Sequence, residues 1–502
     1  MPEPYDILIA GGGINGCGIA CDAASRGLHV CLAEGGDLAQ GTSSASSKLI
    51  HGGLRYLEQY EFRLVREALT EREILMRMAP HIVRPMRFVL PHAPGMRPKW
   101  MLRLGLFLYD WLGKRVTLPA SHGLDLAQDE AGAPLQPQYR SGFEYSDCYA
   151  DDARLTILNA RAAANRGATI LTRTNVAAAR REDGIWIVRL APRDADPLEV
   201  RTRMLVNAAG PWAGRLAGDL PHGEASPRLR LVQGAHIVIP ALYGHGKAYI
   251  FQNHDRRIVF AIPFEEEFTL IGTTDTEFSG DPAKSKPLAS EIDYLLAAVN
   301  AYFRRQLQTS DVVWTFAGVR ALADDVGGTA QTASRDYRLE VDAPEGEAPL
   351  LTVLGGKITS YRTLAAHAME KLAAASPHET RLSALSRTGE IHLPGGDLPP
   401  GGLGALESQL RARHTWLPVS VLRRWLRSYG GEAGAIAAQA DRAGGPGRDF
   451  GAGLYEAEVR WAMAHEWART ADDILWRRTK LGLHFNARQT ADLQAWIDET
   501  PR

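Results

Sequence analysis

Runs of apolar residues bounded by glycine recur along the chain and predict buried parallel strands. The first run is Tyr5 to Ala10 (YDILIA), followed by a glycine-rich turn and a helix of small residues. That helix is expected to end near Gly27, which supplies the left-handed C-cap, and His29 to Glu34 is the next strand. Strand, glycine turn, helix and strand in this order are typical of the start of a doubly wound α/β domain.

Later segments repeat this pattern. Residues 155–167 have helical spacing, and Met204 to Gly210 is expected to be a buried strand that ends in a turn. Residues 348–355 predict another such strand, with a helix that follows from about Lys357. The α/β domain therefore draws its elements from distant parts of the chain.

A second kind of strand lies between these segments. AHIVIP (235–240), RIVFAIPF (257–264) and FTLIGTTD (268–275) are rich in β-branched residues and alternate, which predicts an antiparallel sheet in a separate, inserted domain. Residues 393–404, dense in proline and glycine, form the clearest linker. Beyond them strand patterns disappear, and helical spacing predicts an all-helical C-terminal domain.

The composition is that of a globular protein and excludes several classes. The chain has 502 residues, 45% of them hydrophobic, so more than one domain is expected. A net charge of −1 gives no reason to expect a nucleic-acid partner. The cysteines (Cys17, Cys21, Cys31, Cys148) form no CxxC, which argues against a disulfide framework or metal site and favours a reducing cytoplasm. We find no signal peptide and no apolar run near the ~18 residues of a spanning helix.

The turn after the first strand carries a dinucleotide motif. Gly11, Gly13 and Gly16 form GxGxxG between a strand and a helix, where bare backbone can approach a pyrophosphate at the helix N-terminus. Glu34 ends the second strand at the distance expected for a carboxylate that binds ribose hydroxyls. A turn that merely packs would leave Glu34 unexplained. There is no second motif of this kind, so one dinucleotide is expected, and spacing alone leaves NAD and FAD open.

Candidate chemistry is densest in residues 43–59, SSASSKLIHGGLRYLEQ. Within them His51 precedes two glycines and Arg55, which makes the imidazole a candidate base or substrate hydrogen-bonding group. Elsewhere, His236 and Asp275 are interpreted as structural.

Two further cations lie near predicted strand ends. Lys357 follows two glycines in a strand-to-helix turn, which either stabilises an anion or is an ordinary turn capped by Thr359 or Ser360. Arg320 interrupts an apolar run (FAGVRAL), so its partner is either an internal carboxylate or a substrate phosphate. Arg335 is interpreted as a solvated or ion-paired arginine.

Residues 96–115 combine Trp100, Leu104, Phe107, Leu108 and Trp111 with basic residues at both ends. Too short to span a membrane, this segment either lies in a membrane interface or is a core helix at a domain or dimer contact.

In these residues and the segments around them, the chain resembles the FAD-dependent, quinone-linked sn-glycerol-3-phosphate dehydrogenases over nearly its whole length. The segments that carry the resemblance, in order, are DILIAGGGINGCGIA, GTSSASSKLIHGGLRYLEQYEFRLVREAL, GFEYSDCYADDARL, VNAAGPW, IGTTD, WTFAGVRAL and LGGKITSYRTLAAHAMEKL. Such an ordered set is far more specific than GxGxxG alone.

The resemblance implies FAD as the cofactor and assigns residues to its site. The cofactor positions implied are Gly11, Gly13, Ile14, Asn15, Gly16, Glu34, Thr42, Ser43, Ser47, Lys48, Leu49, Gly53, Val176, Ala209, Gly210, Trp212, Gly318, Gly356, Lys357, Ile358 and Thr359. The substrate positions implied are Arg55, Tyr56, Thr274, Arg320 and Lys357, with His51 and Arg320 as catalytic residues. No metal is implied.

The implied fold is α/β: a Rossmann-like FAD-binding domain of the glutathione-reductase and D-amino-acid-oxidase type, an inserted antiparallel β-sheet substrate domain and a C-terminal all-helical domain. The expected boundaries are 1–80, 148–225 and 315–388 for the FAD-binding domain, 81–147 and 226–314 for the substrate domain, 389–404 for the linker, and 405–502 for the helical domain.

The implied reaction is oxidation of glycerol 3-phosphate to dihydroxyacetone phosphate by hydride transfer from C2 to flavin N5, with a membrane quinone as final acceptor. A homodimer at the inner face of the cytoplasmic membrane is expected, with no nucleic acid bound. The alternatives are an oxidase that uses O2, an amine or hydroxy-acid oxidase of the same fold, and a flavin-containing nucleic-acid or assembly protein.

Overall fold

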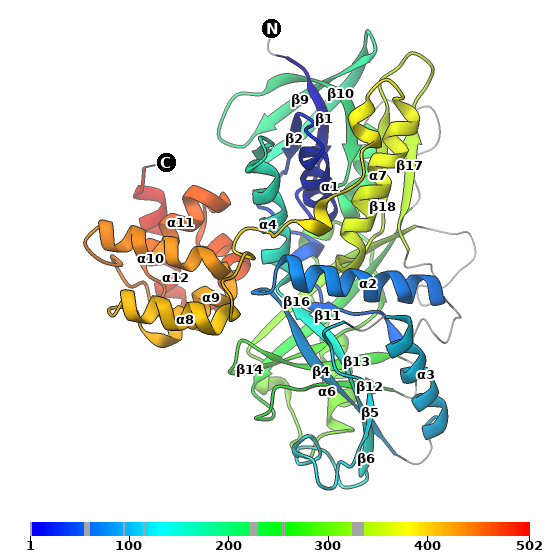
Figure 1. Cartoon of the computed structure of the whole chain (residues 1–502), viewed down its shortest axis with the longest axis vertical. Coiled ribbons are helices and arrows are strands. Elements are labelled where there is room, and N and C mark those ends of the chain that lie inside the picture. The colour runs from blue at the N-terminus through cyan, green and yellow to red at the C-terminus, as the bar shows by residue number, and fades with distance from the viewer. Residues whose placement is uncertain are drawn as a thin grey trace.

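The computed structural model describes residues 3–54, 61–93, 96–113, 116–219, 229–253, 255, 257–323 and 336–501. Two β-sheets follow one another along the long axis of the molecule, and a separate group of helices lies beside them (Figure 1). The first sheet is at the end of the molecule that carries the N-terminus.

The first sheet has a parallel centre. Strand β1 lies between β2 and β10, β7 continues beyond β2 and β18 beyond β10, all parallel, while β17 pairs with β18 and the β8–β9 hairpin with β10 in antiparallel fashion. The strands of this sheet are β1 (Tyr5–Ala10), β2 (Val30–Ala33), β7 (Thr169–Leu171), β8 (Thr174–Glu182), β9 (Ile185–Pro192), β10 (Leu198–Asn207), β17 (Arg338–Asp342) and β18 (Leu350–Leu354). Ile7, Leu8 and Ile9 of β1 are fully buried, as expected for a parallel strand covered on both faces.

Three helices cover one face of this sheet, α1 (Ile14–Ser25), α4 (Asp152–Ala164) and α7 (Tyr361–Ala375). Glycine lets α1 pack closely, because a Cβ at Gly18 would lie 2.6 Å from the ring of Tyr361. The helix expected over 155–167 begins earlier, at Asp152, since the Asp151 side chain caps it by accepting from Arg154 N at 3.1 Å. The strand expected over 204–210 ends at Asn207, where a short turn of 3₁₀ helix follows (Gly210–Trp212).

The second sheet takes most of its strands from the inserted segments. Its strand order is β15-β11-β14-β13-β12-β4-β6-β3, with β16 paired to β11 and β5 paired to β6. The strands are β3 (Leu49–Ile50), β4 (Val83–His92), β5 (His122–Leu124), β6 (Ser141–Ala150), β11 (Leu229–Pro240), β12 (Ala248–Gln252), β13 (Ile258–Phe264), β14 (Phe268–Gly272), β15 (Thr276–Glu277) and β16 (Trp314–Ala323).

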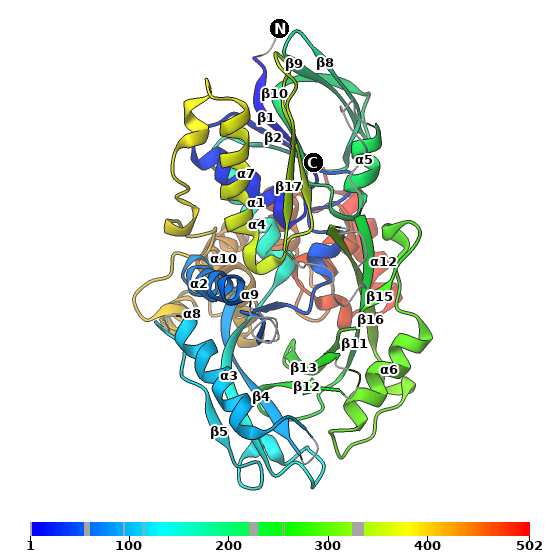
Figure 2. The ribbon, with the colours of Figure 1, turned by 90° about the vertical axis from the view of Figure 1, so that its right-hand side faces the viewer.

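This sheet differs in two respects from the expectation. Pairing is antiparallel except between β4 and β12, which are parallel; they belong to separate insertions, so no hairpin dictates their direction. Strand β3 lies in the range 1–80 and all but the first residue of β16 in the range 315–388, both expected in the FAD-binding domain, yet they pair with β6 and β11 of the second sheet. Helices α3 (Lys99–Leu112) and α6 (Ala289–Asn300) lie on opposite sides of this sheet in Figure 2.

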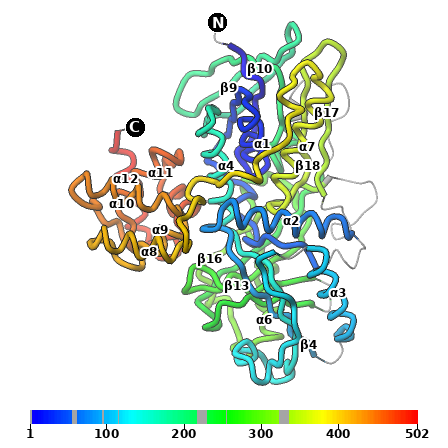
Figure 3. Tube along the Cα trace, viewed as in Figure 1, coloured from blue at the N-terminus to red at the C-terminus, as the bar shows by residue number. Residues whose placement is uncertain are grey.

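Helices make up the C-terminal region. Figure 3 traces the chain from α7 into this group, which lies beside α4. The α-helices of this region are α8 (Gly402–Arg413), α9 (Val419–Tyr429), α10 (Ala433–Arg442), α11 (Glu456–Glu466) and α12 (Ala487–Glu499), with a π-helical turn at Asp473–Arg478. The two α-helices not yet named, α2 (Phe62–Met78) and α5 (Ala213–Asp219), belong to earlier parts of the chain. Trp425 and Ile474 are fully buried in the apolar clusters of the C-terminal region.

Candidate active site

One cavity of about 1600 Å³ is lined by residues of both sheets. The predicted cofactor residues that line it are Gly11, Gly13, Ile14, Asn15, Glu34, Thr42, Ser43, Ser47, Leu49, Gly53, Val176, Ala209, Gly210, Trp212, Gly318, Gly356, Lys357, Ile358 and Thr359. The predicted substrate residues His51 and Arg320 line the same cavity. Arg55 and Tyr56, like Arg335, lie outside the described residues.

The first glycine turn has the geometry of a dinucleotide cradle. Gly11 has a φ of +117°, and a Cβ there would lie 2.5 Å from the carbonyl oxygen of Ala208. Glu34 accepts hydrogen bonds from Gly12 N at 2.6 Å and Gly36 N at 2.7 Å. Burial raises the pKa of Glu34 above its usual value, and the two N–H donors oppose that shift. The carboxylate is therefore held beside the turn where a ribose hydroxyl would bind.

A second glycine turn meets the first through Asn15. Its Nδ2 donates to the carbonyl oxygen of Gly355 at 3.0 Å, which joins the N-terminal turn of α1 to the end of β18. A Cβ at Gly356 would lie 2.7 Å from Asn15 Nδ2, so bare backbone is required there. Asn15 Oδ1 is buried and accepts no hydrogen bond from the described residues. Two bare turns and an unsatisfied amide oxygen fit a dinucleotide such as FAD.

Hydroxyl groups of the loop that begins at Thr42 form hydrogen bonds within the protein. Thr42 Oγ1 donates to the carbonyl oxygen of Val319 at 2.5 Å, and Ser43 Oγ accepts from Ile14 N at 2.9 Å. These bonds attach the loop to β16 and to the first turn of α1. The loop thus joins the two sheets where they border the cavity.

Two predicted cofactor residues do not line the cavity. Lys48 is fully buried, and its Nζ lies 2.8 Å from Asp152 Oδ1, the carboxylate that also accepts from Ser46 Oγ at 2.7 Å. A Cβ at Gly16 would lie 1.9 Å from the carbonyl oxygen of Gly11, so Gly16 serves the close approach of α1 to the turn. Lys48 and Gly16 therefore support residues that line the cavity and do not line it themselves.

Arg320 projects from β16 toward an acidic neighbour. Its Nη1 lies 2.5 Å from Asp275 Oδ1, and its Nη2 donates to the carbonyl oxygen of Thr274 at 3.2 Å. The side chain stays 29% exposed, and Arg320 and Asp275 both line the cavity. Asp275, interpreted from the sequence as structural, therefore orients a guanidinium on the cavity wall.

Thr273 lines the cavity, whereas the predicted substrate residue Thr274 does not. The Thr274 hydroxyl donates to Glu291 Oε1 at 2.6 Å and accepts from Ala235 N at 2.9 Å, within a buried polar cluster. The Thr274 hydroxyl is therefore bonded within the protein, and its role in binding substrate stays a prediction.

The backbone beside His51 is held by a buried network. Gly52 N donates to Tyr109 OH at 2.7 Å, and that hydroxyl donates to Asp147 at 2.8 Å. Arg72 Nη1 pairs with Asp147 Oδ1 at 2.7 Å. Burial raises the pKa of Asp147 to about 6, although Arg72 opposes the shift. The network fixes the turn that carries His51, and sequence reasoning missed it because its members come from separate elements.

His236 is the second histidine on the cavity wall. Its Nε2 lies 2.9 Å from Ser47 Oγ, and its ring stacks on Phe316 at 4.8 Å. Burial lowers its pKa to about 3, and the charges of Lys48 and Arg320 act in the same direction. The imidazole is therefore neutral at physiological pH, so it can accept or donate a hydrogen bond without carrying charge.

The C-terminal helical region also reaches the cavity. Trp476 and Arg477, both in the π-helical turn Asp473–Arg478, are among the lining residues. The sequence showed only helical spacing here, and no local signal linked these residues to a motif more than 400 residues away.

Two family models match this chain, one over its larger N-terminal part and one over its C-terminal part. Residues 6–362 match the model described as FAD dependent oxidoreductase. Residues 386–498 match the model described as the C-terminal domain of alpha-glycerophosphate oxidase.

Curated relatives match over almost their whole length. The chain is 49% identical to the aerobic glycerol-3-phosphate dehydrogenase of Escherichia coli over 498 residues, 99% of this chain and 98% of the relative. It is 51% identical to the glycerol-3-phosphate dehydrogenase of Pseudomonas aeruginosa, over 99% of this chain and 96% of the relative. It is also 49% identical to the D-erythritol 1-phosphate dehydrogenase of Brucella abortus, over 99% of this chain and 98% of the relative.

Among solved structures, the glycerol-3-phosphate dehydrogenase of Bacillus halodurans complexed with FAD superposes with a TM-score of 0.74. The two sequences are 25% identical, and the match covers 99% of this chain and 94% of that one.

Proposed function

Since the chain belongs to the FAD-dependent glycerol-3-phosphate dehydrogenases, we propose that it oxidises sn-glycerol 3-phosphate at C2 to dihydroxyacetone phosphate. The observation that carries this proposal is the pair of cations on the cavity wall: Arg320 comes from the second sheet and Lys357 from the turn after β18. Both border the cavity that the glycine turns shape for FAD. A phosphate dianion is the ligand that two such cations favour.

In this proposal some residues of the cavity bind the substrate phosphate and one accepts a proton. Arg320 and Lys357 bind the phosphate, and Asp275 holds the Arg320 guanidinium in place through its 2.5 Å ion pair. His51, fixed by the Gly52–Tyr109 hydrogen bond, accepts the proton of the C2 hydroxyl as the ketone forms. Bound FAD supplies the hydride acceptor. Holding the substrate in one orientation is the main contribution of the protein, because the cofactor carries the chemistry.

A second substrate deserves the same test, since one relative at 49% identity is named a D-erythritol 1-phosphate dehydrogenase. Both compounds carry a phosphate ester beside a secondary alcohol, so the same cations and base would serve either of them.

The deciding experiment is anaerobic titration of the purified yellow protein with each substrate. We expect glycerol 3-phosphate to bleach the flavin absorbance within one turnover. Glycine and lactate, substrates suited to amine and hydroxy-acid oxidases, should leave it unchanged. Bleaching by D-erythritol 1-phosphate alone would contradict the proposal and assign the longer polyol phosphate.

The electron acceptor is proposed to be a membrane quinone, reached from the inner face of the cytoplasmic membrane. Among the described residues, no helix is both long enough and apolar enough to cross a bilayer. Helix α3 offers a surface instead: Trp100 is 67% exposed, Phe107 56% and Trp111 70%. Its other face, with Leu102 and Leu106, is buried against the second sheet. A helix of this kind can lie in the headgroup region with its aromatic residues at the interface.

A homodimer, the other expected partnership, stays a prediction. Covering α3 with a second copy would bury the same aromatic face, so vesicle binding and oligomeric state must be measured together. Oxygen consumption against reduction of a quinone analogue distinguishes the dehydrogenase from an oxidase.

A further inference from the structure

The loop that follows Glu34 is tied to the far end of the chain. Asp37, whose side chain is fully buried, accepts from Arg477 Nε at 2.6 Å and from Arg478 Nη2 at 2.9 Å. Arg478 Nη1 also donates to Asp37. Asp37 and Arg477 are 440 residues apart in the chain. The segment that carries the ribose-binding carboxylate is therefore held by the C-terminal helical domain.

Asp473 of the same π-helical turn extends this connection. It lies 2.5 Å from Arg477 Nη2 and 2.5 Å from Arg173 Nη2. Arg173 N in turn donates to the carbonyl oxygen of Gly36 at 2.8 Å. The loop is thus attached on one side to the turn before β8 and on the other to the C-terminal domain, with Asp473 between them.

Trp476 supplies a wall to the same cavity. Its ring stacks on Trp314 at 4.4 Å, and Trp314 packs on Phe316 at 4.8 Å, so a row of aromatic rings passes from β16 into the C-terminal domain. A Cβ at Gly482 would lie 2.4 Å from the Trp476 ring, so bare backbone supports the other side of the indole. The orientation of Trp476 is set from both sides.

We propose that the C-terminal helical domain is a functional part of the FAD site, in which Trp476 closes the cavity and Arg477 positions the Glu34–Gln40 loop through Asp37. Arg477 is a positioning residue that acts on the cofactor through this loop. The inference rests on FAD as the cofactor and is independent of which substrate is oxidised. It gives the helical domain a role in holding FAD.

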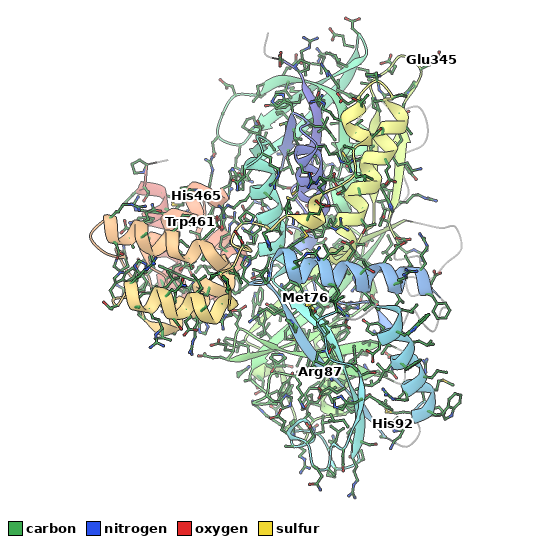
Figure 4. The ribbon with its side chains drawn as sticks, viewed as in Figure 1. Met76, Arg87, His92, Glu345, Trp461 and His465 are labelled. Carbon is green, nitrogen blue, oxygen red and sulfur yellow. The ribbon has the colours of Figure 1, made fainter. Side chains whose placement is uncertain are left out.

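A structural contact at the same interface provides the matched control. Arg161 of α4 donates to Glu432 at 2.8 Å, its side chain is 7% exposed, and it lies over the ring of Trp461 at 5.8 Å. Trp461 and His465 of α11 are both labelled in Figure 4. Arg161 is not among the residues that line the cavity. Loss of Arg161 should weaken domain docking and leave the loop after Glu34 in place.

The test measures FAD binding to the full-length apoprotein, without substrate. Arg477→Met should raise the Kd for FAD at least about tenfold and speed flavin release, because the loop loses a charge-assisted anchor. Arg161→Met should lower the midpoint of thermal unfolding about as much as Arg477→Met does, because each loses a partly or fully buried ion pair. Its Kd for FAD should nevertheless stay within about twofold of the parent. An unchanged Kd in Arg477→Met, or an equal rise in both variants, overturns the proposal.

Asp37→Asn decides whether Arg477 acts through the loop. We expect this variant to bind FAD at least as weakly as Arg477→Met, because it also weakens the Arg478 pair, and the double variant to be no weaker than Asp37→Asn. Additive effects would mean that the guanidinium acts directly on FAD, and the positioning role would be wrong. A chain that binds FAD normally but fails to oxidise glycerol 3-phosphate would contradict the proposed function and leave this inference intact.

Discussion

The Arg320 side chain lines the cavity and forms an ion pair with the carboxylate of Asp275. Asp275 lies 2.5 Å from its Nη1, and Thr273 Oγ1 lies 3.4 Å from its Nη2. A guanidinium held in this way loses little freedom when a phosphate binds. Its removal would leave the Asp275 carboxylate on the cavity wall without its Arg320 partner, where its negative charge repels the substrate phosphate.

Arg320→Met should therefore lower kcat/KM for glycerol 3-phosphate more than about 100-fold, which corresponds to a loss of about 3 kcal/mol of transition-state stabilisation. Steady-state kinetics with a quinone analogue measure the effect. Asp275→Asn, which keeps the cation but releases it, should cost less, mainly in kcat. Equal activity of Arg320→Met and the parent would show that the phosphate binds elsewhere.

His81 is a second residue whose environment sets its chemistry. It is fully buried, and neither ring nitrogen has a hydrogen-bond partner among the described residues. A Cβ at Gly430 would lie 2.9 Å from its ring, so the imidazole fills a space next to the C-terminal domain. Burial lowers its pKa to about 3, with the charge of Arg154 acting in the same direction.

The pH dependence of stability follows from that shift. Between about pH 6.5 and about pH 3 the unfolded chain binds a proton at His81 and the folded chain does not, so stability falls as pH falls. The loss from this residue reaches roughly 2 kcal/mol at pH 5. His81→Leu should therefore show a smaller fall in unfolding midpoint from pH 7.5 to pH 5 than the parent. His378→Leu, at an exposed position, is the control and should follow the parent.

At the scale of elements, α3 has two faces with different partners. Tyr109 of its buried face holds Gly52 beside the candidate base, whereas Trp100 and Trp111 point outward at 67% and 70% exposure. Arg103 and Lys99 of its first turns are exposed as well. Aromatic residues accompanied by cations on an exposed helix suit an anionic lipid surface.

Trp100→Glu combined with Trp111→Glu should release the protein from vesicles that contain anionic lipid, because carboxylates replace the interfacial aromatic rings. Co-sedimentation measures binding, and anaerobic flavin reduction should be retained. Leu385→Glu, at an 88% exposed leucine in another part of the chain, should bind like the parent. Unchanged vesicle binding with a loss of dimer would assign α3 to a contact between copies.

At the scale of the whole molecule, buried charges join the C-terminal domain to α4. Glu466 is fully buried and lies 2.5 Å from Arg154 Nη1, 3.8 Å from Arg161 Nη1 and 3.9 Å from Arg478 Nε. Burial alone would raise the pKa of Glu466, but the three guanidinium groups hold it below its usual value. One carboxylate therefore compensates several cations at this interface.

Glu466→Gln should lower the free energy of unfolding by about 3–5 kcal/mol, since it leaves the fully buried Arg154 guanidinium without its anion. Thermal unfolding and limited proteolysis within residues 388–401 report the loss of docking. Glu267→Gln removes an exposed carboxylate 4.0 Å from His484 and should have little effect. Equal stability of the Glu466 variant and the parent would mean that apolar contacts alone dock the domain.

Local chemistry made much of the site predictable. Gly11, Gly13 and Glu34 belong to one strand-turn-helix-strand unit, so their roles follow from backbone geometry within about 30 residues. The family, the α/β fold with its helical C-terminal region and the FAD cofactor were confirmed. His51, Arg320 and Lys357 line the cavity, as expected for the site, while their roles stay predictions.

Contacts between distant segments were decided by tertiary structure alone. Whether Thr273 or Thr274 lines the cavity depends on the path of the chain between β14 and β15. The pairing of Arg320 with Asp275 depends on how β16 meets the residues after β14, and that of Asp37 with Arg477 on how the last domain docks. Periodicity along the chain determines which residues are buried, because that is a local property. It does not determine which buried or cavity-lining residues meet, because that depends on how the sheets and the helical domain pack together.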